Sequence, residues 1–103
     1  MEEAIRQRIA NEVSLNPVFI YMKGTPSFPV CGFSKTAVEI LANYDVEFGY
    51  ADVLSESGLR EACKEYFDWP TYPMLIVKGE LVGGVDIMKE LHAQGALKAV
   101  LGL

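Results

Sequence analysis

The stretch from residue 23 to residue 34 constrains this chain more than any other, because it places a cysteine where a strand gives way to a helix. The apolar run of residues 18–22 predicts a buried strand, and residues 32–43 carry apolar side chains at helical spacing. Cys31 therefore lies at a helix N-terminus, where unpaired N–H groups and the helix dipole favour thiolate over thiol. Lys23 adds positive charge if the loop folds back. The alternative is a small buried apolar residue, but core packing would not need the glycine, prolines and lysine around Cys31.

Length and composition indicate one globular domain, residues 1–103. Half of the residues are hydrophobic and 22% are charged, which is ordinary for a folded protein. No apolar run approaches the roughly 20 residues of a membrane span, and Met1-Glu2-Glu3 is acidic where targeting peptides are basic. We therefore expect a cytoplasmic protein with no membrane partner. The net charge of −5 argues against nucleic-acid binding, which depends on attraction to phosphate.

The two cysteines, Cys31 and Cys63, are too few for a disulfide scaffold or for a complete tetrahedral metal site within one chain. Cys63 shares a helical spacing of four with Leu59 and Phe67, which favours core packing. The one histidine, His92, falls in a predicted helix. We expect it to be solvated or hydrogen-bonded there rather than catalytic.

The order of the predicted elements indicates an α/β domain. Helices are predicted at residues 2–15, 32–43, 59–67, from 86 onward and in a short tail at 97–101, and strands at 18–22, 48–52, 74–77 and 81–82. A helix between the first two strands implies a parallel crossover. Lys78-Gly79-Glu80 has the length of a hairpin connection, so the last two strands are antiparallel. These elements give a four-stranded mixed sheet flanked by helices.

Three motifs resemble the CGFS class of monothiol glutaredoxins: Cys31-Gly32-Phe33-Ser34, Trp69-Pro70-Thr71-Tyr72-Pro73 and Gly83-Gly84-Val85-Asp86. All three fall at the junctions expected of a thioredoxin-like fold, so the resemblance covers essentially the whole chain. Lys23 precedes Cys31 by eight residues, which is similar to the lengthened loop of the monothiol class.

The resemblance implies that the chain binds glutathione, a small peptide with two carboxylates, one ammonium and one thiol. Lys23, Arg60 and Lys64 resemble the cations of the family's site. Arg60 and Lys64 are four residues apart on a predicted helix and share a face, although they would be unremarkable as surface charges. In this family Pro73 is cis, which leaves the Tyr72 N–H and C=O free to pair with the glutathione backbone as an added strand would. A plain turn before a strand is the alternative.

The second half of the expected site follows Gly83-Gly84, which carries no side chains to obstruct a ligand. Val85 and Asp86 come next at a helix N-terminus, whose N–H groups can receive the γ-glutamyl carboxylate while Asp86 pairs with the ammonium. Asp86 can also act as the helix N-cap, and the two roles are compatible. Many relatives have a cysteine at the position of Val85, so this chain lacks that internal disulfide partner for Cys31. Cys63, on a core-facing stripe, is an unsuitable substitute.

Ser34 occupies the position of the second cysteine in a C-x-x-C pair, so Cys31 has no adjacent thiol to resolve a mixed disulfide. A [2Fe-2S] cluster takes four thiolates. One Cys31 and one glutathione thiol from each of two protomers supply four, and the resemblance likewise implies a homodimer bridged by the cluster, with Cys31 as both the reactive residue and the metal ligand.

These inferences lead to three functional hypotheses. The first is a carrier that assembles [2Fe-2S] clusters and transfers them to apo iron–sulfur proteins; Ser34 and the long loop favour it. The second is a glutathione-dependent oxidoreductase that reduces protein–glutathione mixed disulfides through one cysteine. The third is a regulatory module that pairs with a BolA-like protein through the same cluster, and the sequence does not separate it from the first.

Overall fold

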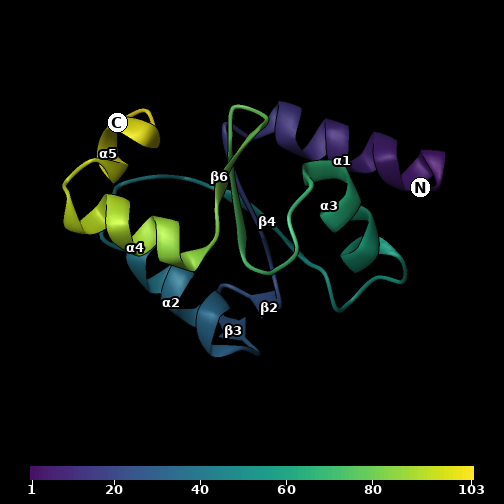
Figure 1. Cartoon of the computed structure of the whole chain (residues 1–103), viewed down its shortest axis with the longest axis horizontal. Coiled ribbons are helices and arrows are strands. Elements are labelled where there is room, and N and C mark those ends of the chain that lie inside the picture. Colours follow the sequence, from purple (N-terminus) through teal and green to yellow (C-terminus); the bar gives the residue numbers. More distant parts are fainter.

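A four-stranded mixed sheet forms the centre of the computed structural model, which describes all of residues 1–103 (Figure 1). Its strands are β1 (Val18–Met22), β4 (Gly49–Asp52), β5 (Met74–Val77) and β6 (Glu80–Gly83), in the order β4-β1-β5-β6. β1 is parallel to β4 and antiparallel to β5, and β5 is antiparallel to β6. The predicted mixed sheet, with one parallel crossover and one hairpin, is confirmed.

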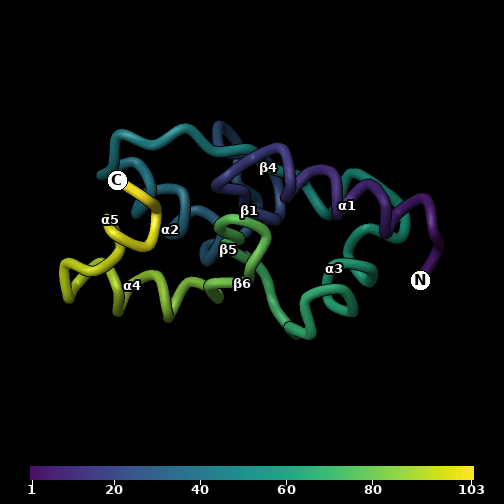
Figure 2. The backbone as a smooth tube through the Cα atoms, turned by 90° about the horizontal axis from the view of Figure 1, so that it is seen from above, coloured from purple at the N-terminus to yellow at the C-terminus, as the bar shows by residue number.

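Five helices lie on the two faces of this sheet (Figure 2). Their bounds are α1 (Glu3–Leu15), α2 (Gly32–Leu41), α3 (Leu59–Phe67), α4 (Val85–Ala93) and α5 (Leu97–Val100). Residues of α1 and α3 belong to one apolar core cluster, and residues of α2, α4 and α5 belong to a second one on the opposite face. None of the helices combines the length and the apolarity that a membrane crossing needs.

The central strand β1 contributes to both clusters, because successive side chains of a strand point to opposite faces. Phe19 and Tyr21 pack with α1 and α3, while Val18, Ile20 and Met22 pack with α2, α4 and α5. All five residues are buried. The uninterrupted apolar run at residues 18–22 is therefore a strand covered on both faces, as predicted.

The ends of some elements differ from the predicted ones by one or two residues. α2 ends at Leu41 rather than at Asn43, because the Asn43 side chain donates hydrogen bonds to the Glu39 and Ile40 carbonyls (3.1 and 3.2 Å) and so closes the helix. β6 is longer than predicted and includes Glu80 and Gly83.

The loop before Cys31 is a folded hairpin, which the sequence did not predict. β2 (Gly24–Thr25) pairs with β3 (Phe28–Pro29) in an antiparallel arrangement. The Gly24 N–H donates a 2.9 Å hydrogen bond to the carboxylate of Asp52 at the end of β4, and the same carboxylate oxygen accepts from the Leu54 N–H at 3.0 Å. The hairpin is thus fastened to the end of the parallel strand pair, beside the helix that carries the cysteine.

Gly24 closes this hairpin in a conformation that excludes other residues. Its φ is +89°, and a Cβ atom would lie 2.4 Å from the Phe28 carbonyl oxygen and 2.7 Å from the Val30 nitrogen. Both atoms belong to the backbone, so no side-chain rotation relieves the overlap.

We predict that Gly24→Ala lowers the free energy of unfolding by more than the ~1–2 kcal/mol that a left-handed conformation costs an L-residue. Gly95→Ala is the matched control, because Gly95 also has a positive φ (+72°) but would bring its Cβ within 4 Å of nothing. Urea denaturation of both variants measures the difference. Equal losses would show that the backbone contacts at Gly24 are unimportant.

Candidate functional site

A pocket of about 610 Å³ opens where the end of β1, α3, the loop before β5 and the start of α4 meet. Six of the seven residues predicted for the site line it: Lys23, Arg60, Lys64, Tyr72, Val85 and Asp86. The structure therefore brings together residues that are up to 63 positions apart in the sequence (86 minus 23). Their part in ligand binding stays a prediction.

Cys31, the seventh predicted residue, lies at the edge of this pocket rather than in its lining. It is the N-cap residue of α2, with extended backbone angles, and the Ser34 N–H donates to its Sγ atom at 3.4 Å. Lys23 and Phe33, which do line the pocket, both act on this thiol, Lys23 through its charge and Phe33 through its N–H. The half-buried thiol and the pocket form one site.

Ser34 is a hydrogen-bonding centre and not merely a missing cysteine. Its side chain is fully buried, its hydroxyl oxygen accepts the Lys23 N–H at 3.1 Å, and it lies 3.5 Å from the Cys31 Sγ atom. When Cys31 is ionised, the hydroxyl donates its hydrogen to the thiolate sulfur. Ser34 thus joins the start of the hairpin to the thiol, a role that the sequence analysis missed.

The surroundings of Cys31 favour its ionised form. Burial raises the pKa of the thiol, but the hydroxyl and N–H of Ser34, the N–H of Phe33 and the charge of Lys23 together outweigh it, so the pKa lies below its ordinary value. Hydrogen bonds to a thiolate and a nearby cation both stabilise the charged form. The expected position of Cys31 at the start of a helix is confirmed, and its surroundings support the predicted ionisation.

Cys63 has the opposite surroundings. Its side chain is fully buried in the core cluster beneath α1 and α3, and this burial raises its pKa to about 12. It is a core residue, as its spacing predicts. No group of three or more His, Cys, Asp and Glu side chains is placed to hold a metal ion.

The one histidine, His92, is hydrogen-bonded to the Tyr44 hydroxyl (Nδ1 to Oη, 2.5 Å), as expected.

The predicted N-cap role of Asp86 is wrong. α4 begins at Val85, Gly84 occupies the N-cap position and no side chain caps the helix. The first helical hydrogen bond runs from the Met88 N–H to the Gly84 carbonyl (3.0 Å), which places Asp86 inside the first turn. There its exposed carboxylate is favoured by the helix dipole and forms no ion pair within the chain.

The Tyr72–Pro73 peptide bond is cis. The backbone N–H and C=O of Tyr72 take part in no backbone hydrogen bond, and β5 starts only at Met74. Together with the first-turn N–H groups of α4, the pocket wall therefore offers an unpaired strand-like edge and a helix N-terminus. Both are surfaces that bind peptide groups and carboxylates.

The cations of the pocket are largely uncompensated. Arg60 is exposed and, like Lys23, has no ion-pair partner in the chain. The Lys64 ammonium lies 4.0 Å from a Glu61 carboxylate oxygen, which makes a weak ion pair. A chain with a net charge of −5 thus keeps three positive side chains around one pocket. This arrangement suits a ligand with a carboxylate.

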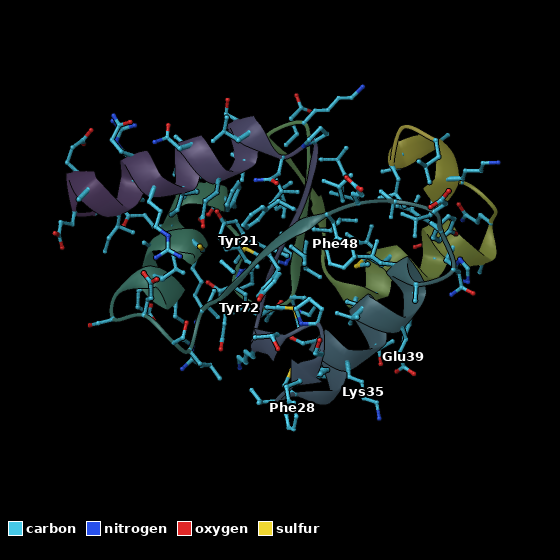
Figure 3. All side chains as sticks on the ribbon, turned by 180° about the vertical axis from the view of Figure 1, so that it is seen from behind. Tyr21, Phe28, Lys35, Glu39, Phe48 and Tyr72 are labelled. Atoms are coloured by element: carbon cyan, nitrogen blue, oxygen red, sulfur yellow. The ribbon has the colours of Figure 1, made fainter.

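Exposed apolar side chains surround Cys31. Phe28, Val30 and Phe33 are 79%, 59% and 63% exposed, and Figure 3 shows Phe28 projecting from the hairpin away from the body of the protein. We call these three residues the apolar collar.

Trp69 also lines the pocket, but it was not among the predicted site residues. Its place in the Trp69–Pro73 motif could have indicated this position.

A mixed sheet with a cysteine at the start of the helix after its central strand, and a cis-proline loop beside it, defines a thiol protein of the thioredoxin-like fold. The family model described as Glutaredoxin matches residues 18–82. The chain is 50% identical over 94 residues to Glutaredoxin 4 of Pasteurella multocida, covering 91% of this chain and 86% of that protein. It belongs to the glutaredoxin family, in the monothiol class.

Two further comparisons support this assignment. Monothiol glutaredoxin-S11 of Oryza sativa subsp. japonica is 46% identical over 99 residues, which are 96% of this chain but 20% of the rice protein. The solution structure of reduced poplar apo GrxS14 superposes with a TM-score of 0.84 at 38% identity, covering 95% of this chain and 90% of that one. The chain thus spans about a fifth of the length of one relative and nearly the whole of others.

We predict that Ser34→Ala raises the pKa of Cys31, because the thiolate loses its hydroxyl donor. The rate of alkylation by iodoacetamide follows the thiolate fraction, so its pH profile shifts to higher pH. Lys23→Gln should shift the profile in the same direction but by less, since the charge of Lys23 acts more weakly than the Ser34 hydrogen bonds. Added salt should reduce only the Lys23 contribution. An unchanged profile in Ser34→Ala would contradict this account.

Proposed function

We propose that this glutaredoxin binds a [2Fe-2S] cluster together with glutathione and delivers the cluster to apo iron–sulfur proteins. The observation that carries the proposal is a single ionisable thiol, Cys31, at the edge of a pocket whose charges and backbone groups complement glutathione. Membership of the glutaredoxin family supports glutathione as the ligand.

Each group of glutathione has a complementary partner in the pocket. The α-carboxylate and the ammonium of the γ-glutamyl residue share one carbon atom, so their partners must be adjacent; the N–H groups at the start of α4 and the Asp86 carboxylate meet this requirement. The peptide part pairs with the backbone edge of Tyr72. The glycine carboxylate then faces the cations Lys23, Arg60 and Lys64. This orientation directs the glutathione thiol toward Cys31.

A [2Fe-2S] cluster needs more thiolates than one chain provides. Cys31 and one glutathione supply two of the four ligands, and the buried Cys63 cannot supply a third. A second protomer with its own glutathione completes the set, so the cluster-bound form is a homodimer. The apolar collar around Cys31 gives this face a surface suited to contact with another protein. A BolA-like protein in place of the second protomer would use the same face.

The oxidoreductase activity is the second candidate, and the lowered pKa of Cys31 supports it. The thiolate would attack the glutathione sulfur of a mixed disulfide, release the protein thiol and keep the glutathione on Cys31. A second glutathione thiolate would then attack that disulfide and leave as oxidised glutathione. With Ser34 at the resolving position and Cys63 buried, every turnover depends on external glutathione.

We predict that Cys31→Ser abolishes cluster binding and that Cys63→Ser retains it, because only Cys31 is both accessible and ionisable. Iron and sulfide content after anaerobic reconstitution measures the result.

We also predict that glutathione is required as a ligand of the cluster. Reconstitution with a phosphine reductant in place of glutathione should therefore yield apo-protein. Equal loss in both variants, or full occupancy without glutathione, would rule out the proposed ligand set. Reduction of a mixed disulfide by protein that holds no cluster under any condition would favour the enzyme.

We predict that Asp86→Asn weakens glutathione binding roughly tenfold, the lower range for a charge-assisted pair because the site is open to solvent. The free energy of unfolding should fall by no more than the ~0.3–1 kcal/mol that a carboxylate gains from the helix dipole, since Asp86 caps no helix. Calorimetric titration with glutathione measures the affinity. Asp45→Asn, an exposed residue outside the pocket, is the control. Unchanged affinity in Asp86→Asn would remove Asp86 from the site.

A further inference from the structure

The side chain of Tyr72 is buried in the core, although this residue also lines the pocket. It is 7% exposed and lies in the core cluster beneath α1 and α3; Figure 3 shows it inside the body of the protein, whereas Phe28 projects from it. Its hydroxyl donates a 2.6 Å hydrogen bond to the carbonyl of Arg60, 12 residues earlier in the chain. Tyr72 therefore offers its backbone to the pocket and its hydroxyl to α3.

This hydrogen bond joins two walls of the pocket. Arg60 lies in the first turn of α3, and its side chain lines the pocket together with that of Lys64, one turn further on. The Tyr72 backbone edge forms the neighbouring wall. The Tyr72 hydroxyl thus links residues 69–73 to α3 through a side-chain hydrogen bond; a backbone bond from the Trp69 N–H to the Lys64 carbonyl (3.1 Å) adjoins it at the helix end.

The surroundings keep this hydroxyl in its donor form. Burial raises the pKa of Tyr72 and so disfavours its phenolate. The neighbouring Cys63 thiol acts in the same direction, because its interaction with the Tyr72 hydroxyl also raises the pKa of Tyr72. An apolar side chain at position 72 would present the same backbone edge to a ligand. The hydroxyl serves only the contact with α3.

We propose that the Tyr72 hydroxyl is a positioning group of the glutathione site. It holds α3 against the cis-proline loop, so that Arg60 and Lys64 stand at the right distance from the Tyr72 backbone edge to receive the glycine carboxylate while the edge binds the peptide. This inference rests on the proposed glutathione site. It adds a positioning role for the side chain of Tyr72, a residue that contacts the ligand only through its backbone.

The test compares glutathione with its analogue amidated at the glycine carboxylate, by calorimetric titration of the wild-type chain and of Tyr72→Phe. The variant keeps the ring and loses the donor. We expect its affinity for glutathione to fall roughly three- to tenfold, the range of one ordinary hydrogen bond. Its affinity for the amidated analogue should match that of the wild type, because that ligand gains little from Arg60 and Lys64.

Tyr21→Phe is the matched control. Tyr21 lies in the same core cluster, and its hydroxyl donates to Glu12 at 2.9 Å, but it does not line the pocket. It should lower the free energy of unfolding by about as much as Tyr72→Phe while leaving glutathione affinity unchanged. In the Lys64→Gln background, Tyr72→Phe should cause a smaller loss of glutathione affinity, because one of the two cations that the hydroxyl positions is then missing.

The outcomes separate this inference from the proposed function. If the wild type binds no glutathione, the proposed function fails and the inference fails with it. If the wild type binds and Tyr72→Phe binds equally well, or loses the same factor for both ligands, the positioning role alone is overturned. If the losses of glutathione affinity in Tyr72→Phe and Lys64→Gln simply add in the double variant, the positioning role is overturned by that result alone. This holds even if one of the variants is less stable.

Discussion

The burial of β1 on both faces is the constraint on which the rest of this structure depends. Its five residues supply apolar side chains to two separate core clusters, and its two edges pair with β4 and β5. The chain leaves this strand at Lys23, so the hairpin and the thiol begin from the most firmly held part of the fold.

The fold could be predicted from the sequence wherever apolar side chains form a continuous run or follow a helical period. Residues 18–22 and 74–77 read as strands, and the spacing of Leu59, Cys63 and Phe67 predicts α3 and the burial of Cys63. The gathering of Lys23, Arg60, Lys64, Tyr72, Val85 and Asp86 around one pocket was also predictable, because each lies next to the end of a strand or on a helix flanking the sheet. Resemblance to a known family assigned their roles.

What could not be predicted depends on hydrogen bonds between distant groups. The two-residue strands at Gly24 and Phe28 are too short to show a period, and the Asp52 carboxylate that fastens them lies 28 residues from Gly24. Asp86 satisfies the residue preference for an N-cap, but the helix starts two residues earlier than that preference implies. The Tyr72 hydroxyl shows no sequence signal at all, because its partner is a backbone carbonyl.

The bonding of Ser34 has a consequence for how such a chain can change over evolution. Its oxygen accepts the Lys23 N–H and lies 3.5 Å from the Cys31 sulfur, and its side chain has no exposure to solvent. A sulfur atom in that place is larger and a weaker acceptor, so one codon change to cysteine would loosen the hairpin as it created a dithiol. Ser34 therefore couples the single thiol of this site to the fold of the hairpin that precedes it.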